Sequence, residues 1–105
     1  MPQDNEHQGR IAIITGGSGG IGGAIATRLT AEGATVHVLD LKSGADHTRS
    51  HIVDVGAEAS VNRIIDTIGA EHGAIDYLIC CAGIYRPQPF LELSFDAWRQ
   101  TLQIN

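Results

Sequence analysis

The sequence predicts an α/β fold, in which an incomplete parallel sheet of about four strands, in the order 3-2-1-4, carries helices on both faces. Two observations support this prediction. Segments rich in β-branched residues alternate with segments of helical periodicity, the pattern of strands joined by helical crossovers. The first apolar run, residues 11–14, is continuous rather than alternating, as expected of a strand covered on both faces. Right-handed crossovers restrict such an order to one half of a doubly wound sheet.

The first strand is predicted over residues 10–15, and a helix follows over residues 20–32. Apolar residues recur along that second segment at the spacing of one helical face, namely Ile21, Ala24, Ile25 and Leu29. Gly33 then stands where a helix commonly ends in a left-handed residue.

A second strand is predicted over residues 35–40, which are rich in β-branched side chains and end in an aspartate. Residues 41–49 are polar and irregular, and Gly44 marks a turn among them. A short third strand fits within residues 50–55, around Ile52 and Val53.

A second helix is predicted over residues 57–72, because one face carries a regular apolar stripe made of Val61, Ile64, Ile65 and Ile68. Gly73 closes this helix. The fourth strand is predicted over residues 74–81.

The last part of the chain is predicted to be a loop followed by a helix. Residues 82–93 contain Pro87 and Pro89, which forbid regular strand pairing there. Ser94 is suited to cap the N-terminus of a helix that runs to Asn105, and Asp96 suits the dipole of its first turn.

The composition limits the chain to one domain and excludes several classes of partner. The net charge is −5, and no basic cluster is present that would bind nucleic acid or an anionic membrane. No apolar run approaches the roughly 20 residues of a membrane helix. We expect residues 1–9 to be a loose polar tail, and because they lack the features of a signal peptide we expect a cytoplasmic protein.

The two cysteines, Cys80 and Cys81, are neighbours on the predicted fourth strand. Successive strand residues point to opposite faces, which disfavours a disulfide between them. We therefore expect two buried, reduced thiols.

A glycine-rich turn joins the first strand to the first helix and is the main functional signal. Its sequence, Thr-Gly-Gly-Ser-Gly-Gly-Ile-Gly over residues 15–22, fits the dinucleotide fingerprint at Gly17, Gly19 and Gly22. Backbone N–H groups at a helix N-terminus attract phosphate, and glycines let the phosphate come close. A purely structural turn would also use glycines, but the strand before and the helix after favour a Rossmann-type site for a pyrophosphate.

Asp40 ends the second strand about 20 residues after the glycine turn. A carboxylate there can accept both ribose hydroxyls of an adenosine and repels a 2′-phosphate, so NAD is predicted in preference to NADP. The alternative is a surface aspartate that caps a turn, and Lys42 nearby would offset part of the repulsion. Asp54 is weaker evidence, since an aspartate after a short strand commonly caps a turn.

No metal site is predicted. His47 and His51 are four residues apart, but their surroundings are typical of a loop, and no third ligand stands at metal spacing. No serine has the context of a catalytic nucleophile either.

Together these residues resemble the N-terminal part of the short-chain dehydrogenase/reductase family. The resemblance covers residues 10–105 and predicts that they form the N-terminal half of a dinucleotide-binding domain. It is carried by residues 15–22, by Asp40, by Asp54-Val55 and by Cys80-Cys81-Ala82-Gly83-Ile84, which is similar to the family's Asn-Asn-Ala-Gly-Ile segment.

The resemblance implies an NAD(H)-dependent oxidoreductase that interconverts a secondary alcohol and a ketone and assembles as a homo-oligomer. It assigns the pyrophosphate to Gly16, Gly20, Ile21 and Gly22, assisted by Ser18. The adenosine ribose falls to Asp40, the adenine to Asp54 and Val55, and the nicotinamide ribose to Ala82 and Gly83. Asn105 matches the family's catalytic asparagine, which anchors a helix kink and a water of the proton relay.

Two departures from the family pattern keep other interpretations open. Cys80 replaces an asparagine whose amide ties the fourth strand to its neighbours. Neither Tyr77 nor Tyr85 has a lysine four residues later, so the tyrosine-lysine pair that supplies the proton is missing from these residues. A dinucleotide-binding module without turnover, or an inactive fragment that does not fold alone, therefore remains an alternative.

Overall fold

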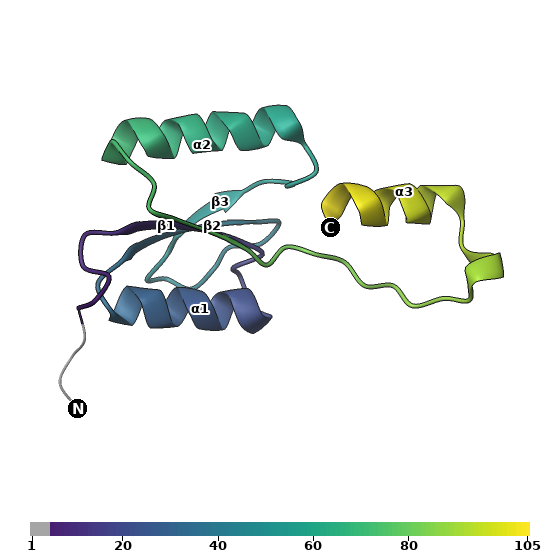
Figure 1. Ribbon diagram of the computed structural model, residues 1–105, viewed down its shortest axis with the longest axis horizontal. Helices are drawn as coiled ribbons and strands as arrows, with labels where there is room; N and C mark the ends of the chain where they lie inside the picture. The colour runs from purple at the N-terminus through teal and green to yellow at the C-terminus, as the bar shows by residue number, and fades with distance from the viewer. Residues whose placement is uncertain (1–4) are drawn as a thin grey trace.

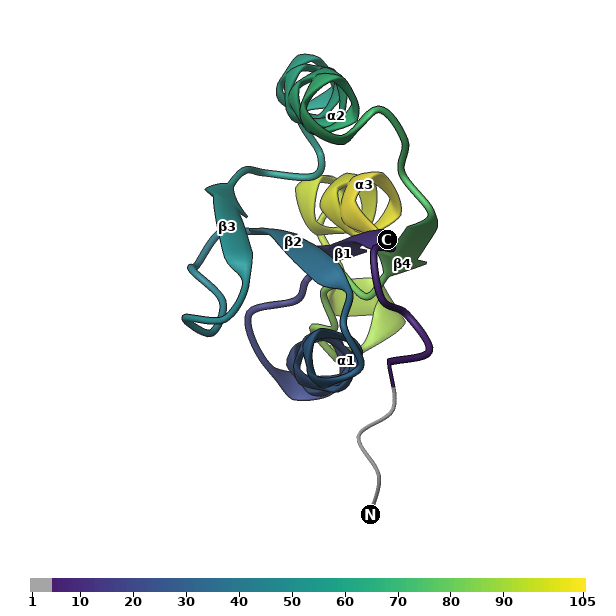
Figure 2. The ribbon, with the colours of Figure 1, turned by 90° about the vertical axis from the view of Figure 1, so that its left-hand side faces the viewer.

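The computed structural model describes residues 5–105 and has a four-stranded parallel sheet between two helices (Figure 1). The strand order is β3-β2-β1-β4, so the predicted order is confirmed. Seen end-on, α1 lies on one face of the sheet and α2 on the other (Figure 2). The elements are β1 (Ile11–Thr15), α1 (Gly20–Ala31), β2 (Thr35–Asp40), β3 (Arg49–Ile52), α2 (Glu58–His72) and β4 (Tyr77–Cys80), followed by a 3₁₀ turn, η1 (Phe90–Glu92), and α3 (Phe95–Ile104).

The sheet has an apolar layer on each face. Alternate residues of β1 point to opposite sides, so that Ile14 packs with α1 and Ile13 packs with α2. The layer under α1 includes Ala12, Val36 and Val38, and the layer under α2 includes Ile11, Leu39, Val53 and Ile68. The continuous apolar run of the first strand therefore has the predicted cause.

The two large helices end as predicted. Gly33 has a φ of 97°, and the backbone bonds from Gly33 to Thr30 and from Ala34 to Leu29 close the end of α1. Gly73 has a φ of 79° and ends α2 in the left-handed region. These are conformations that residues with a Cβ rarely adopt, which is why glycine stands at both.

Three elements differ in extent from their prediction. β3 starts at Arg49 and stops at Ile52, because the chain turns at Asp54, whose carboxylate accepts a hydrogen bond from the Gly56 amide. β4 starts only at Tyr77, since Asp76 is engaged with both the amide and the carbonyl of Ile11. The loop after β4 contains η1, because proline prevents strand pairing without preventing a 3₁₀ turn.

The expectation of two buried thiols is wrong, since Cys80 is exposed and Cys81 is only partly buried. The cause is the position of β4 at the edge of the sheet, where β1 is its only neighbour within residues 5–105. Leu78, two residues before Cys80 on the same face, is also largely exposed. A strand sequence predicts alternation, but it does not predict whether the second face is covered.

Residues 5–9 do not form the loose tail expected of residues 1–9. They make a turn, in which the Gln8 amide bonds to the Asn5 carbonyl and His7 bonds to Tyr77 and to Glu32. Residues 1–4 lie outside the described part of the chain. Among the residues that are described, no helix is long and apolar enough to cross a membrane.

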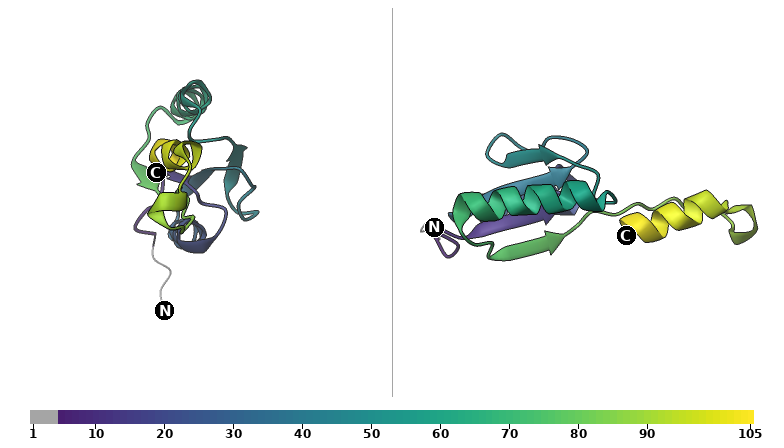
Figure 3. Two further views of the ribbon diagram at one scale, coloured as in Figure 1. Left: turned by 90° about the vertical axis from the view of Figure 1, so that its right-hand side faces the viewer. Right: turned by 90° about the horizontal axis from the view of Figure 1, so that it is seen from above.

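Residues 84–105, called the arm below, extend beyond the carboxyl ends of the strands (Figure 3). The arm contains η1 and α3, and the long axis of the molecule, 53 Å, reflects its reach. Ser94 caps α3 as predicted, because its hydroxyl accepts a hydrogen bond from the Ala97 amide at 3.1 Å.

Candidate functional site

A cleft of about 360 Å³ lies at the carboxyl ends of the strands, where ligands bind in open parallel sheets. The glycine turn after β1, the end of β2, the turn after β3 and the loop after β4 form its walls. Arg86 and Gln100 of the arm contribute to one side. Four segments that are distant in sequence therefore meet at one place because all four strands run in the same direction.

The glycines of the turn have two different roles. Gly16 has a φ of 68°, and a Cβ there would lie 2.7 Å from the backbone nitrogen of Ala82. A Cβ at Gly22 would collide with the carbonyl oxygen of Gly16. These two glycines therefore permit close packing of the turn, α1 and the loop after β4. Gly19 and Gly20, in contrast, face open space, which leaves room for a ligand.

The N-terminus of α1 follows this turn and has no side-chain cap among the described residues. Its cap residue, Gly19, is extended, and the first helical bond joins the Gly23 amide to the Gly19 carbonyl. The amides of Gly20, Ile21 and Gly22 precede that bond, so they cannot be satisfied within the helix. The positive end of the helix dipole adds to the attraction of this end for an anion.

Asp40 lies at the end of β2 and lines the cleft. Its Oδ2 accepts hydrogen bonds from the Ser18 hydroxyl at 2.6 Å and the Ser18 amide at 3.2 Å, and its Oδ1 accepts one from the Leu41 amide at 2.7 Å. Partial burial raises the pKa of this carboxyl. The bonds from Ser18 and Leu41, helped by the charge of Lys42, outweigh that effect and hold the pKa below its usual value. The side chain is therefore an anion at neutral pH.

Asp54 and Val55 also line the cleft, on the side of β3. The Asp54 carboxylate accepts a hydrogen bond from the Gly56 amide at 2.8 Å, and its carbonyl accepts one from the Ala57 amide at 2.9 Å. The side chain thus caps the turn before α2. This is the structural interpretation that the sequence left open, and one carboxylate oxygen remains for a ligand.

The loop after β4 is hydrogen-bonded at one end to Thr15 of β1 and at the other end to Asn105, which follows α3. The Cys81 amide donates to the Thr15 carbonyl at 3.0 Å, and the Ala82 amide donates to the Thr15 hydroxyl at 3.3 Å. At the other end, the Asn105 side chain accepts a hydrogen bond from the Ile84 amide at 2.7 Å and donates one to the Ile84 carbonyl at 3.0 Å. Asn105 therefore holds the end of α3 against this loop.

Most of the residues predicted from the sequence meet at this cleft. Those that line it are Gly16, Ser18, Asp40, Asp54, Val55, Ala82 and Gly83. The remaining predicted residues do not line it, namely Gly20, Ile21 and Gly22, which lie at the start of α1, and Asn105, which lines a neighbouring cavity together with Val55 and Ala82.

Sequence reasoning missed Gln100 and Ile104 as lining residues of the cleft, to which Arg86 also contributes. Arg86 donates a hydrogen bond to Gln100, so the two side chains form one unit on the arm. No local signal identifies these residues, because their position depends on the direction in which the loop after β4 carries α3.

Comparisons with known proteins agree with this arrangement. The family model described as short chain dehydrogenase matches residues 10–105. The chain is 38% identical to a D-threitol dehydrogenase of Mycolicibacterium smegmatis, an alignment that covers 92% of this chain and 42% of that protein. The chain thus spans about two fifths of the length of the curated relatives it matches.

Solved structures show the same backbone. The ligand-free aldohexose dehydrogenase of Thermoplasma acidophilum superposes with a TM-score of 0.91 at 31% identity, covering 96% of this chain and 40% of that one. A short chain dehydrogenase of Burkholderia cenocepacia J2315 in complex with NADP superposes with a TM-score of 0.82 at 33% identity, covering 92% of this chain and 45% of that one. By its sequence, its strand order and its cleft, this chain belongs to the short-chain dehydrogenase family.

Proposed function

We propose that this chain is the cofactor-binding half of an NAD(H)-dependent oxidoreductase that interconverts a secondary alcohol and a ketone. The observation that carries the proposal is the ionised Asp40 at the edge of the cleft, beside the glycine turn. Bound nicotinamide dinucleotide supplies the carbon that accepts or donates the hydride. The residues of this chain bind and orient that cofactor.

The cleft provides the donors and acceptors that a dinucleotide requires. The uncapped start of α1, with Gly20, Ile21 and Gly22, offers amides to a pyrophosphate. The open space over Gly19 and Gly20 admits it. Ala82 and Gly83 are small residues on the opposite wall, where a nicotinamide ribose would find no obstructing side chain.

Asp40 would accept hydrogen bonds from the adenosine ribose. A carboxylate has about four lone-pair sites, and Ser18 and Leu41 fill three of them. One ribose hydroxyl takes the fourth site, and a second requires the Ser18 hydroxyl to rotate away. A 2′-phosphate would bring negative charge against the ionised Asp40, so we propose NAD rather than NADP. The relative from Burkholderia that binds NADP makes this choice worth testing.

The proposal is tested by titrating the chain with NADH and NADPH and following the fluorescence of the nicotinamide. Wild type is expected to bind NADH more tightly. Asp40→Ala is expected to lower the affinity for NADH about tenfold or more, because a hydrogen bond to a charged group contributes about 1.5–3 kcal/mol. The same substitution is expected to raise the affinity for NADPH. Asp46→Ala is the control, since Asp46 is an exposed acidic residue of the loop between β2 and β3 that does not line the cleft.

The assignment of Asp40 to the ribose and the proposed cofactor binding are contradicted by different results. If Asp40→Ala leaves both affinities unchanged, the ribose assignment is wrong. If the wild-type chain binds neither nucleotide, the cofactor-binding function is wrong for these residues.

A second candidate, binding without turnover by this chain, is favoured by the positions of its tyrosines. The Tyr77 hydroxyl is bonded to His7 at 2.9 Å, and Tyr85 lies on the arm and is almost fully exposed. Neither has a lysine four residues later. NADH bound by the chain is therefore expected to persist when a ketone is added, and steady loss of its absorbance at 340 nm would show that the chain is itself catalytic.

A further inference from the structure

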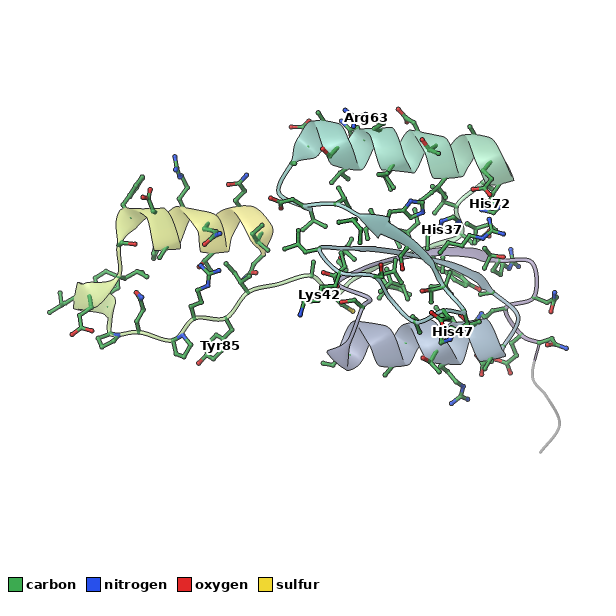
Figure 4. The ribbon with its side chains drawn as sticks, turned by 180° about the vertical axis from the view of Figure 1, so that it is seen from behind. His37, Lys42, His47, Arg63, His72 and Tyr85 are labelled. Atoms are coloured by element: carbon green, nitrogen blue, oxygen red, sulfur yellow. The ribbon has the colours of Figure 1, made fainter. Side chains whose placement is uncertain are left out.

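Three histidines from three elements meet between α2 and the sheet, and none of them lines the cleft. His37 lies in β2, His51 lies in β3, and His72 is the last residue of α2. The His37 Nδ1 is 2.8 Å from the His51 Nε2, and the His37 Nε2 is 2.9 Å from the His72 Nε2. Figure 4 shows His37 and His72 side by side beneath α2.

This cluster corrects the interpretation of the histidines made from the sequence. His51 belongs to β3 rather than to a loop, and its partner is His37 rather than the exposed His47. Residues 14 and 35 positions apart in the chain are brought together by the parallel pairing of β2 with β3 and by the return of α2 across the sheet. Sequence spacing alone could not show this.

Glu71 completes a set of possible metal ligands. One ring nitrogen of His37, one ring nitrogen of His72 and a Glu71 carboxylate oxygen all lie within 4.8 Å of one another. The His72 Nε2 is 3.6 Å from the Glu71 Oε2. A tetrahedral Zn²⁺ with bonds of about 2.0–2.1 Å separates its ligand atoms by roughly 3.3 Å. The separation of the His37 and His72 nitrogens, 2.9 Å, and that of the His72 nitrogen and the Glu71 oxygen, 3.6 Å, lie on either side of that value.

Two further residues orient these ligands as the outer shell of a metal site does. The His51 Nε2 can accept a hydrogen bond from the His37 Nδ1–H, and in that tautomer the His37 Nε2 carries a lone pair on the side of His72. Arg49 donates to the Glu71 Oε1 at 2.7 Å, which leaves the Oε2 for a cation. His37 itself is 1% exposed, so its imidazole is held in one place by the core.

We propose that His37, His72 and Glu71 bind a Zn²⁺ ion that joins the C-terminal end of α2 to β2, with a fourth position taken by water. Glu71 has half of its side chain exposed, which gives the ion a path to the site. The site lies away from the nucleotide cleft and does not depend on the proposed function.

The test is a calorimetric titration of the tag-free, EDTA-treated 105-residue chain with Zn²⁺, together with the visible absorption of the Co²⁺ form. One equivalent of Zn²⁺ and the intense bands of a four-coordinate Co²⁺ are expected. Glu71→Gln and His72→Gln are each expected to weaken binding by more than the roughly 10–100-fold that loss of an outer-shell partner causes. His51→Gln, which removes such a partner, is expected to fall within that range.

Two variants serve as controls. His47→Gln removes an exposed histidine of the loop, and His7→Gln removes the central residue of another possible ligand group, formed with Glu6 and Glu32. Neither is expected to change the affinity. Far-UV circular dichroism of each variant confirms its fold, and Glu71→Gln is the safest variant because the residue is half exposed.

Three results would overturn the proposal. Absence of Zn²⁺ uptake by the wild-type chain would show a chain of hydrogen-bonded histidines only. The same conclusion would follow if binding survived both Glu71→Gln and His72→Gln. Loss of binding in His7→Gln would place the ion at the other group of residues.

Discussion

The sheet and the arm use their apolar side chains in opposite ways. In the sheet, Ile13, Ile14 and Val38 are almost completely buried between α1 and α2. In the arm, Leu91 is 95% exposed, and Phe90 and Phe95 are also mostly exposed. Both regions carry apolar side chains on regular elements. The comparison teaches that apolar residues can predict an element without predicting what their side chains pack against.

The attachment of the two regions differs as well. The strands are joined by continuous backbone pairing and by packed side chains. The hydrogen bonds between Asn105 and Ile84 tie the end of the arm to its own start, and the Gln103 side chain links the arm to the turn after β3 by donating to the Gly56 carbonyl at 2.9 Å. Exposed hydrogen bonds of this kind contribute about 0.5–1.5 kcal/mol each. We therefore expect the arm to be much less stable than the sheet.

The largest predicted difference concerns removal of one apolar side chain from each region. Ile13→Ala leaves a cavity in the layer under α2 and is expected to lower the free energy of unfolding by about 2–5 kcal/mol. Leu102→Ala, at a residue of α3 that is 67% exposed, is expected to change it by less than about 0.5 kcal/mol. Urea denaturation followed by circular dichroism measures both. Equal losses would show that α3 is packed as tightly as β1.

A second prediction concerns the pH dependence of stability, which we expect to arise in the sheet rather than in the arm. Burial between α2 and the sheet lowers the pKa of His37 from 6.5 to about 4, aided by His51, His72 and Arg49 and opposed by Glu71. Between those two values the unfolded chain binds a proton that the folded chain does not, so stability is expected to fall as the pH drops from 6.5 towards 4. Thermal unfolding of the metal-free chain at pH 7 and pH 5 tests this.

Imidazole NMR resonances provide the direct check on that prediction. The His37 ring is expected to remain neutral at pH 5, and no histidine lies in the arm to give a similar effect there. A His37 ring that titrates near 6.5 in the folded chain would contradict the burial on which the prediction rests.

Much of the sheet and part of the site follow from local sequence. The apolar run before the glycine turn, the β-branched residues before Asp40 and the glycines after α1 and α2 predicted two strands and two helix ends, because each reports a local conformational preference. The strand order followed from the right-handed crossovers between alternating strands and helices. The cleft followed in turn, since parallel strands bring their carboxyl ends together. The same reasoning could not find Gln100 or the contact of His37 with His72, which depend on distant segments.

Asn105 illustrates the difference between what a sequence motif predicts and what only the fold shows. The resemblance assigns it a catalytic part, but both polar atoms of its side chain are engaged with the backbone of Ile84. A residue can therefore be identified from a motif while its partners remain unknown until the fold is seen. Cys80 gives the converse case, since alternation along its strand was predicted and its exposure at the sheet edge was not.

The smallest predicted effect concerns this contact between Asn105 and Ile84. Asn105→Ala removes two exposed hydrogen bonds and is expected to cost about 1–3 kcal/mol of local stability, while global unfolding in urea changes little. The observable is the fluorescence anisotropy decay of Trp98, the single tryptophan, which reports the motion of α3. Asn62→Ala, at an exposed position of α2, is the matched control.

Faster motion of Trp98 in Asn105→Ala alone would show that one side chain positions the arm. Unchanged motion would mean that Gln103 and Arg86 suffice, and the distinction between a packed sheet and a polar-tethered arm would then have to rest on other contacts.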